Sequence, residues 1–319
     1  MTSKKTKGLK LSICIVTDSQ LQKSRSCLKS IYRHRPDCDF EIIFLDNASV
    51  NSIHKMVEKE FPDVRLIIND RKHSFGHNYN KTLRLAKGRF VLILNDDTEI
   101  LDDAINRSLS FMKSRNDVGI LGAQQLLPDG NILRSCSRSF PTLETYTWEK
   151  LFMTHLFPRS RRFSKLYYGN WDKKDSRQVD QVSGAFMLVR KEIIDELGGF
   201  DENISFYYED TDLCRRITDA GWRIWYAADC QILHHHGSSL RTRIRSRAKI
   251  EEFRSAVYYF KKYDELENYN LMKLLDIVHN ISKVALFLPV DRSSSRAILE
   301  VVKWHFRNLS LQSVLDDRM

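Results

Sequence analysis

Short apolar runs alternate with polar segments of helical spacing along the first part of this chain. The apolar runs cover residues 11–16, 40–45, 64–68 and 90–94, and the helical segments between them cover about 22–33, 51–60 and 76–87. Apolar runs without internal alternation are typical of strands that are buried on both faces. Strand, helix and strand repeated in this order indicate a mainly parallel sheet covered by helices. The predicted fold class is therefore α/β.

The pattern becomes less regular in the middle of the chain and changes character near residue 240. Residues 134–178 are basic, aromatic and weakly patterned, which fits either a substrate-facing loop or a plain surface excursion. Amphipathic helical patterns fill most of 248–310. We place a boundary near 240, which gives one domain at 1–240 and a basic, helical extension at 241–319. Further predicted elements are a helix at 102–114, strands at 118–123, 182–189 and 230–233, and a helix that begins at the acids of 209–212.

Polar side chains follow each of the first four predicted strands. Asx residues are common in turns and at helix N-termini, so each of these residues alone fits a structural role. Chemistry in such sheets collects beyond the carboxyl ends of the strands, so four polar strand ends together predict a site there. The residues are Thr17 and Asp18, Asp46 and Asn47, Asn69 and Asp70, and Asn95 to Asp97.

Asp96 and Asp97 place two adjacent carboxylates at the end of a buried strand. Like charges held close repel one another, and burial adds a desolvation cost. A divalent cation such as Mg²⁺ or Mn²⁺ would offset both, because hard cations take carboxylate oxygens and share their shell with substrate phosphates. A helix cap with solvated neighbours explains the same two residues without a metal.

Two further clusters offer chemistry near the end of the first domain. The acids of 209–212 begin a predicted helix, where the helix dipole favours them, and the aromatic residues at 206–208 would form a partly dry wall. Such a wall raises a carboxylate pKa toward the range of a general base. The internal run His234 to His236 follows a strand, where consecutive side chains point in different directions. One histidine is therefore expected to face the site as a metal ligand.

The charge of the chain predicts attraction to anions. The net charge is +10 and the isoelectric point is near 9.2, which fits nucleic acid, acidic lipids or phosphorylated small molecules. The sequence contains no G-x-x-x-x-G-K-[ST] motif and no G-x-G-x-x-G after a strand, which leaves a P-loop hydrolase and a dinucleotide-binding site unsupported. No recognisable nucleic-acid module is present.

The cysteines and the hydropathy predict a protein of the cytoplasm. None of the six cysteines forms a C-x-x-C pair, and several fall inside predicted strands or helices, which suits free thiols in a reducing compartment. The N-terminal stretch reads as a basic segment followed by a first strand rather than as a signal peptide. No run approaches the roughly 18 apolar residues that a transmembrane helix needs.

Taken together, the motifs resemble the family 2 glycosyltransferases with the GT-A fold. Within that family they are most similar to the bacterial rhamnosyltransferase-type enzymes that build surface polysaccharides. The resemblance implies a Rossmann-like nucleotide-diphospho-sugar transferase domain with a mixed, mainly parallel sheet, a donor half at about 10–125 and an acceptor half at about 180–240. It rests on SICIVT, FLDNAS, NDRKHSFGHNYNKTL, FVLILNDDTEI, SGAFMLVRKEIIDELGGFDE, FYYEDTDLCRRITDAGWRI and ILHHHGSS, in consistent order over roughly residues 10–240.

The resemblance also implies roles for individual residues. A cation bridges the donor diphosphate in this family, and a carboxylate takes the proton from the acceptor hydroxyl. The matched positions are Thr17, Asp46, Asn47, Asn80 and Asp96 for the donor nucleotide, Gly184, Ala185 and Glu209 for the acceptor side, Asp97 and His234 for the metal, and Asp210 for the general base.

The implied activity is an inverting transfer of one sugar, with rhamnose as a candidate, from a dTDP- or UDP-linked donor. The implied acceptor is a hydroxyl of a glycan or of a lipid-pyrophosphate-linked saccharide, and the implied cofactor is Mg²⁺ or Mn²⁺. A cation and basic groups absorb the charge that develops on the leaving diphosphate. The Q-x-x-R-W motif of processive family members is absent, which favours one sugar per encounter.

Three positions depart from the family pattern. Asp18 stands where an aromatic residue is usual, which puts stacking on the nucleotide base in doubt. Asn95 occupies the first place of the DxD-type triplet, so the metal contact rests more heavily on Asp97. Thr82 replaces a common glycine.

The basic C-terminal part suggests contact with a membrane surface. The alternating arginines of 241–247 and the apolar-faced helix near 271–289 would rest against anionic headgroups at the inner face of the cell membrane. A helical cap packed on the catalytic domain, with a solvated basic face, explains the same residues.

Other functions fit the same residues. A nucleotidyltransferase or a sugar-nucleotide hydrolase also uses carboxylate-bound Mg²⁺ on a similar sheet. A non-catalytic basic protein would bind nucleic acid or an acidic polymer in a strongly salt-dependent way. A family member that has lost its activity is a further alternative, given Asp18.

Overall fold

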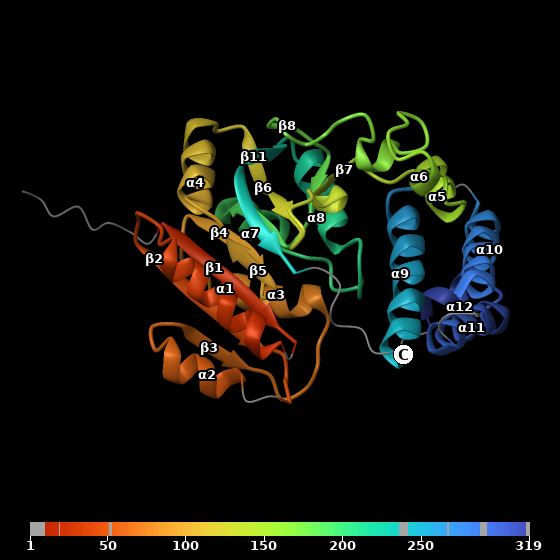
Figure 1. The fold of residues 1–319 in the computed structure, drawn as a ribbon, viewed down its shortest axis with the longest axis horizontal. Coiled ribbons are helices and arrows are strands. Elements are labelled where there is room, and N and C mark those ends of the chain that lie inside the picture. Colours follow the sequence, from red (N-terminus) through yellow and green to blue (C-terminus); the bar gives the residue numbers. More distant parts are fainter. Residues whose placement is uncertain are drawn as a thin grey trace, which may run out of the picture. The chain divides into compact units, whose positions relative to one another are not determined.

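The computed structural model describes residues 10–18, 20–50, 53–235, 242–266, 268–287 and 292–316. The chain forms two compact units, which Figure 1 colours along the sequence. The sheet unit comprises Met1–Arg138, Lys173–Glu202 and Asp210–His236, and the helical unit comprises Ser139–Asp172, Asn203–Glu209 and Gly237–Met319. The boundary expected near 240 falls in 236–241, outside the described residues, as do His236 and Arg241.

The sheet unit follows the predicted alternation of strands and helices. The four N-terminal strands and the three helices between them begin and end within about two residues of the expected positions. The strands are β1 (Leu11–Thr17), β2 (Phe40–Asp46), β3 (Arg65–Ile68), β4 (Phe90–Asn95), β5 (Thr98–Ile100), β6 (Val118–Leu126), β7 (Ser137–Arg138), β8 (Arg177–Gln178), β9 (Gln181–Val182), β10 (Phe186–Arg190) and β11 (Arg223–His234). The helices are α1 (Leu21–Arg33), α2 (Ile53–Glu60), α3 (Phe75–Leu85), α4 (Ala104–Ser114), η1 (Arg134–Cys136, a 3₁₀ turn), α7 (Lys191–Leu197) and α8 (Glu209–Asp219).

The main sheet has nine strands, in the order β3-β2-β1-β4-β10-β6-β11-β5, with β8 paired to β11. β1 runs parallel to β2 and β4, and β2 runs parallel to β3. β10 is antiparallel to both of its neighbours, and β11 is parallel to β6 but antiparallel to β5 and β8. The sheet is therefore mixed and mainly parallel, as the resemblance implied, and β1, β2 and β4 have their carboxyl ends at one edge.

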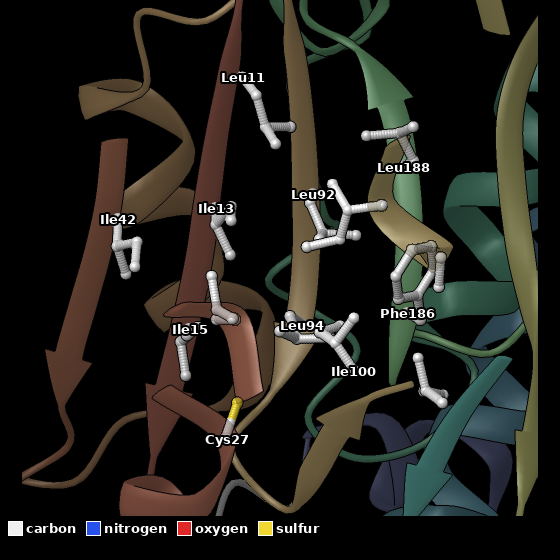
Figure 2. Close-up of a cluster of buried hydrophobic side chains, with 14 of the residues drawn as sticks. Leu11, Ile13, Ile15, Cys27, Ile42, Leu92, Leu94, Ile100, Phe186 and Leu188 are labelled. Carbon is white, nitrogen blue, oxygen red and sulfur yellow. The ribbon is translucent and has the colours of Figure 1, made fainter. Parts of the chain in front are cut away.

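Burial on both faces explains why β1 is apolar without a break. Ile13 is in register with Leu92 on β4, which is in turn opposite Leu188 on β10, and Figure 2 shows these side chains on one face of the sheet. That face belongs to the core that includes residues of α1, α2 and α4. Cys14 points to the other face and is also fully buried. The apolar runs are therefore the centre of a three-layer arrangement of helices and sheet.

The strand predicted at 182–189 is interrupted, so this prediction is wrong in part. Gln181–Val182 forms β9, which pairs with β7 in a separate two-stranded sheet, whereas Phe186–Arg190 forms β10 in the main sheet. Residues 183–185 cross between the two sheets, and the N–H of Ser183 donates to the carbonyl of Cys136. Buried residues lie on both sides of Ser183 and Gly184, at Val182 and at Phe186–Arg190, so the sequence reads as one strand across the crossing.

The strand predicted at 230–233 is the last part of a longer strand. β11 begins at Arg223, pairs with β6, and shifts register between Ala227 and Gln231. Beyond the shift it pairs with β5, which sets His234 opposite Thr98. The end of β11 thus lies next to the turn that follows β4.

The helical unit has its own core. Its elements are α5 (Leu143–Lys150), α6 (Met153–Leu156), η2 (Lys165–Tyr167, a 3₁₀ turn), α9 (Thr242–Lys262), α10 (Tyr269–Phe287), α11 (Arg292–Arg307) and α12 (Leu311–Asp316). A capping box between Thr142 and Thr145 starts α5. Aromatic residues such as Tyr259 and Phe260 on α9 pack with Tyr146 on α5. The weakly patterned segment of the sequence therefore contains short helices, and residues 139–172 complete the core of the C-terminal helices.

Candidate active site

Three strand ends meet at one edge of the main sheet. Thr17 at the end of β1 is in register with Asp46 at the end of β2, and Asn95 at the end of β4 is in register with Val16. The backbone N–H of Asn47 donates to the carbonyl of Thr17 over 3.1 Å, which ties the two turns together. The structure thus brings the polar strand ends predicted from the sequence to a common edge.

Asp96 is buried in the protein, with 7% of its surface exposed. Its Oδ2 accepts hydrogen bonds from the hydroxyl groups of Thr17, over 2.5 Å, and Ser24, over 2.9 Å. Burial raises the pKa of this carboxyl group to about 6, although both hydroxyl donors act in the opposite direction. Asp96 therefore fastens the turn after β4 to the end of β1 and to α1.

The carboxylate of Asp97 lies beside two nitrogen atoms. Its Oδ1 is 3.3 Å from Nε2 of His234, and its Oδ2 is 4.0 Å from Nζ of Lys23. The backbone carbonyl of Asp97 also accepts a hydrogen bond from the N–H of His235 over 2.9 Å. Two segments far apart in the sequence therefore meet and place the two residues expected to bind metal side by side.

Gln125 on β6 orients the ring of His234. Oε1 of Gln125 is 2.9 Å from Nδ1 of His234, so Nδ1 carries the proton and Nε2 is left as an acceptor. An acceptor nitrogen and a carboxylate oxygen 3.3 Å apart repel one another unless a proton or a cation lies between them. A carboxylate and an imidazole arranged in this way fit a divalent cation.

The protein alone would supply few ligands to such a cation. Over the described part of the chain, no group of three or more His, Cys, Asp or Glu side chains is placed to hold a metal ion. A Mg²⁺ or Mn²⁺ at Asp97 and His234 would therefore take its other ligands from water and substrate oxygens. This is the usual way in which Mg²⁺ is bound together with phosphates.

A network of buried amides backs the ends of β2 and β3. Nδ2 of Asn69 donates to Oδ1 of Asn47 and to Oδ1 of Asn78, over 3.1 and 2.8 Å. The same Oδ1 of Asn47 accepts from the backbone N–H of His73, and Nζ of Lys81 donates to Oδ1 of Asn69. Because each amide is held by the next, the turn carrying Asn47 has a fixed shape.

Asn80 lies on α3, and its side-chain amide is hydrogen-bonded to residues 200 and 202 of the same unit. Its Nδ2 donates to the carbonyl of Phe200 and to Oε1 of Glu202, over 2.9 and 3.0 Å, and its Oδ1 accepts from the N–H of Phe200 over 2.8 Å. The amide thus holds the turn after α7, where Gly198 and Gly199 have positive φ angles. In this arrangement Asn80 contributes to the site by holding the turn after α7 in position.

Asp210 lies at the start of α8, next to the segment that crosses between the two sheets. Its Oδ2 accepts from the backbone N–H of Gly184 over 3.3 Å, and its Oδ1 is 3.5 Å from Nη2 of Arg138. The side chain is 16% exposed, so solvent or a substrate can reach it. Glu209, expected on the acceptor side, is the first residue of the same helix.

The segment at 183–185 also contacts the turn after β4. The backbone N–H of Asn95 donates to the carbonyl of Ala185 over 3.1 Å. A Cβ atom on Gly184 would lie 3.3 Å from the ring of Phe75, so a larger residue would crowd the space between that ring and Asp210. A backbone hydrogen bond therefore links the turn after β4, which is expected to bind the donor, to the segment at 183–185, which is expected on the acceptor side.

Sequence reasoning missed four residues that shape this site. Ser24 and Lys23 lie on α1, directly after β1, and a helix that follows a polar strand end is a signal that could have found them. Gln125 lies just beyond the predicted end of its strand. Arg138 lies in the weakly patterned segment, where the sequence gives no signal.

The fold is shared with a glycosyltransferase of known structure. The mannosyltransferase PcManGT from Pyrobaculum calidifontis, solved in complex with GDP-Man and Mn²⁺, superposes with a TM-score of 0.52. The match covers 97% of this chain and 83% of that one, at 15% sequence identity. The architecture is therefore that of the GT-A glycosyltransferases.

Sequence comparison gives the family. Residues 10–249 match the family described as glycosyltransferase like family 2, and the chain belongs to this family. It is a glycosyltransferase.

Its curated relatives include two bacterial rhamnosyltransferases. The chain is 26% identical to the N-acetylglucosaminyl-diphospho-decaprenol L-rhamnosyltransferase of Mycobacterium tuberculosis over 209 residues, which are 62% of this chain and 67% of that protein. It is 25% identical to the rhamnosyltransferase WbbL of Escherichia coli K12 over 215 residues, which are 65% of this chain and 77% of that protein.

Proposed function

We propose that this glycosyltransferase moves one sugar per encounter from a nucleotide-diphosphate donor to an acceptor hydroxyl, with inversion at the anomeric carbon. The observation that carries the proposal is the pair formed by Asp97 and His234, whose Oδ1 and Nε2 atoms are 3.3 Å apart at the carboxyl edge of the sheet. A cation-binding edge of this kind serves a diphosphate leaving group. The absence of a Q-x-x-R-W motif supports single transfer.

The donor nucleotide would lie against the ends of β1 and β2. Asp46 and Asn47 offer carboxylate and amide groups there, Thr17 holds Asp96 beside them through its hydroxyl, and the amide network behind Asn47 keeps this set in place. Asp46 is itself fixed, because its Oδ1 accepts from the N–H of Ser49 over 2.9 Å. Polar groups that are fixed in this way suit the base and ribose of a dTDP or UDP donor. Asp96 and Asn80 would support the donor site by holding the neighbouring turns in place.

Asp97 and His234 would hold a Mg²⁺ or Mn²⁺ ion. When bound, the ion supplies positive charge that stabilises the departing diphosphate. Oε1 of Gln125 accepts a hydrogen bond from the Nδ1–H group of His234, which leaves Nε2 available as a ligand. Lys23 lies on the other side of the carboxylate and adds a second positive group at the same edge.

Asp210 is the proposed general base. Its carboxylate would take the proton of the acceptor hydroxyl, and the acceptor oxygen would form a bond to the anomeric carbon. The bond from that carbon to the diphosphate oxygen breaks at the same time, and the nucleoside diphosphate leaves with the electron pair. The N–H of Gly184 and the guanidinium of Arg138 orient the carboxylate, and Ala185 and Glu209 flank it.

The relatives support rhamnose as the sugar and a lipid-linked saccharide as the acceptor. The mycobacterial relative is named for transfer of L-rhamnose to N-acetylglucosaminyl-diphospho-decaprenol, and other relatives are named for O-antigen synthesis. We therefore propose a role in surface polysaccharide synthesis, at the cytoplasmic side of a membrane.

A surface of the helical unit supports contact with that membrane. Leu271, Leu274, Val278 and Ile281 recur at helical spacing on α10 and are 37 to 56% exposed. No helix in the described ranges has the length and apolar composition needed to span a bilayer. We propose that this stripe rests on the lipid surface. Replacing Leu274 and Ile281 by glutamine should abolish flotation with anionic liposomes, and unchanged flotation would contradict the contact.

The test of the function is transfer by the purified full chain. dTDP-rhamnose, Mn²⁺ and a polyprenyl-diphospho-N-acetylglucosamine acceptor should give a rhamnosylated lipid with inverted anomeric configuration, and EDTA should abolish it. Asp210→Asn is the control for the chemical step. Release of free sugar or of nucleoside monophosphate, without a glycosylated acceptor from any donor, would instead point to a hydrolase or a nucleotidyltransferase.

A further inference from the structure

A turn of the helical unit presents two large apolar side chains to solvent. Leu156 ends α6 and is 65% exposed, and Phe157 follows it and is 49% exposed. Apolar residues that stand singly on a surface need no explanation, but adjacent large ones mark a candidate contact, and their surroundings indicate what they bind. We call residues 156–165 the basic turn, because exposed basic residues follow these two side chains.

The basic turn has a fixed backbone. The N–H of Ser160 donates to the carbonyl of Phe157 over 3.0 Å, and the N–H of Ser164 donates to the carbonyl of Ser160 over 3.1 Å. A Cβ atom on Gly169 would lie 2.7 Å from the carbonyl oxygen of Pro158, so the segment that follows packs directly against the turn. The turn is therefore built to hold its apolar residues at the surface.

Aromatic rings connect the basic turn to α5. The ring centroid of Phe157 is 5.3 Å from that of Phe163, which in turn is 4.9 Å from that of Trp148 on α5. Phe157 is thus supported by protein on one side, while about half of its surface remains in solvent.

Positive charge surrounds the two apolar side chains. The sequence from 151 to 171 contains no aspartate and no glutamate. The exposed basic residues of the turn are Arg159, Arg161, Arg162 and Lys165.

The two acids of α5 compensate this charge only in part. Glu144 lies 3.8 Å from Arg162, and Glu149 accepts a hydrogen bond from the hydroxyl group of Tyr167. Within the described ranges, the other three basic side chains of the turn form no ion pair. The turn therefore combines an apolar tip with a net positive rim.

We propose that the basic turn inserts Leu156 and Phe157 into an anionic lipid surface while its arginines and lysine contact the headgroups. An apolar tip with a cationic rim matches a bilayer, where negative headgroups cover an apolar interior. An acidic protein surface would pair with the charges but would leave the apolar tip without a counterpart. A lipid surface is therefore the partner that fits both features.

This contact adds charge dependence to the lipid contact proposed for the apolar stripe of α10. A single weak signal holds a protein on a bilayer only marginally, whereas two signals together give stable binding. The inference rests on the proposed function in that it assumes a lipid-linked acceptor. Transfer to a short-chain, water-soluble acceptor should consequently be unchanged in variants of the basic turn.

The first test is sedimentation of the full chain with phosphatidylcholine vesicles, with and without phosphatidylglycerol. Binding should be at least about 10-fold tighter when the anionic lipid is present. Arg159→Gln combined with Arg161→Gln should weaken that binding by about 25-fold, since each basic residue near such a surface contributes roughly 5-fold. Lys29→Gln combined with Lys59→Gln, an equal change of charge on α1 and α2 of the sheet unit, should stay within about 2-fold.

The second test measures insertion. Brominated lipids should quench the added fluorescence of Phe157→Trp, because the new ring enters the acyl region. Leu156→Gln combined with Phe157→Gln should weaken binding by about 10-fold or more. Phe306→Gln is the matched control, because Phe306 is 63% exposed on α11, which lies at the other end of the helical unit from α6 (Figure 1). This control should stay within about 2-fold of the parent protein.

Several results would overturn the proposal. They are equal binding to both kinds of vesicle, parental binding by either double variant of the turn at an unchanged unfolding temperature, and equal loss in the paired control. Phe157→Trp that binds polyglutamate but is not quenched by brominated lipid would assign an acidic protein surface instead. Failure of the parent protein to transfer sugar to any acceptor would contradict the proposed function, and vesicle binding distinguishes that outcome from loss of the lipid contact.

Discussion

The hydroxyl group of Thr17 donates a 2.5 Å hydrogen bond to Oδ2 of Asp96, a residue 79 positions further along the chain. This bond joins the end of β1 to the turn after β4 and stabilises the ionised form of a carboxyl group that burial disfavours. The pKa of this carboxyl group is about 6 in the folded protein, whereas an aspartate ordinarily has a pKa of 3.8, so between these values the folded state binds more protons than the unfolded chain. Asp96 therefore stabilises the fold most at low pH, and its contribution falls as the pH rises through 6.

Replacing Thr17 by valine should raise the pKa of Asp96 further above 6, because the valine keeps the shape of the side chain but removes the strongest donor to the carboxylate. Carboxyl ¹³C chemical shifts, followed against pH in EDTA, would measure this change. Thr142→Val, which removes a hydroxyl from the cap of α5, is the control and should leave the Asp96 titration in place. A lowered or unchanged midpoint in Thr17→Val would contradict the role of this bond.

Gln125→Leu should weaken Mn²⁺ binding by about 10- to 100-fold, since the ring of His234 loses the partner that fixes its tautomer. Electron paramagnetic resonance of free Mn²⁺, in the presence of a nucleoside diphosphate, gives the affinity. Gln124→Leu is a matched control on the same strand, because that buried amide bonds Tyr226 and the carbonyl of Lys173 instead. Equal weakening by both variants would mean that the loss of a buried amide, and not the orientation of His234, is responsible.

Asp210→Asn should lower kcat by about 10²- to 10⁴-fold, the usual contribution of a positioned general base. Binding of the nucleotide donor should be retained, because Asp210 contacts Gly184 and Arg138 and lies at the start of α8. Single-turnover kinetics and donor titration separate the two effects. A variant with normal turnover would remove Asp210 from the reaction.

Asp212→Ala should lower the stability of the fold, whereas Asp210→Asn should lower turnover. Asp212 is fully buried and its Oδ2 accepts from Nε of Arg216 over 2.8 Å. Losing the carboxylate removes a charge-assisted hydrogen bond from the partly buried guanidinium of Arg216, so the free energy of unfolding should fall by about 1.5–3 kcal/mol. Chemical denaturation would measure the change, and a variant as stable as the parent protein would show that the carbonyls of Leu197 and Gly199 suffice for Arg216.

Lowering the pH from 6.5 toward 3 should destabilise the protein through His279. Burial, with Lys283 and Lys150 nearby, lowers the pKa of this imidazole to about 3, so the unfolded chain binds a proton in this range that the folded protein does not. In His279→Gln, which has no titrating ring, the dependence of unfolding free energy on pH should be less steep. An identical slope in both proteins would contradict the contribution of this histidine.

The sequence was sufficient wherever local pattern determines structure. The strands around Ile13 and Leu92 are buried on both faces, so their apolarity is continuous and their positions were predicted closely. The sequence pattern predicts that one histidine of 234–236 faces the carboxylates as a metal ligand, and the family resemblance selects His234 and Asp97 as the pair. The approach of these two residues depends on β11 pairing with β5 beyond a register shift, and no local pattern encodes that pairing.

The segments that were missed depend on contacts across long stretches of chain. Ser183 to Ala185 cross between two sheets because their partners are Cys136 and Asn95, and neither partner is visible in the residues of the segment itself. Lys150 lies in a segment without clear periodicity and forms an ion pair with Asp276, more than a hundred residues away. Such pairings are set by the tertiary fold, so they cannot be predicted from secondary-structure propensity or from residue spacing.

The helical unit is discontinuous in sequence, and this limits how the protein can be divided or recombined. Cutting the chain at 240 would separate Asp276 and His305 from Lys150 and leave α9 without Tyr146. Exchanging only the C-terminal helices between members of the family would have the same effect. A working chimera must therefore carry residues 139–172 and 203–209 together with the helices that follow 241, so that the unit is inherited as three separate segments and not as a tail.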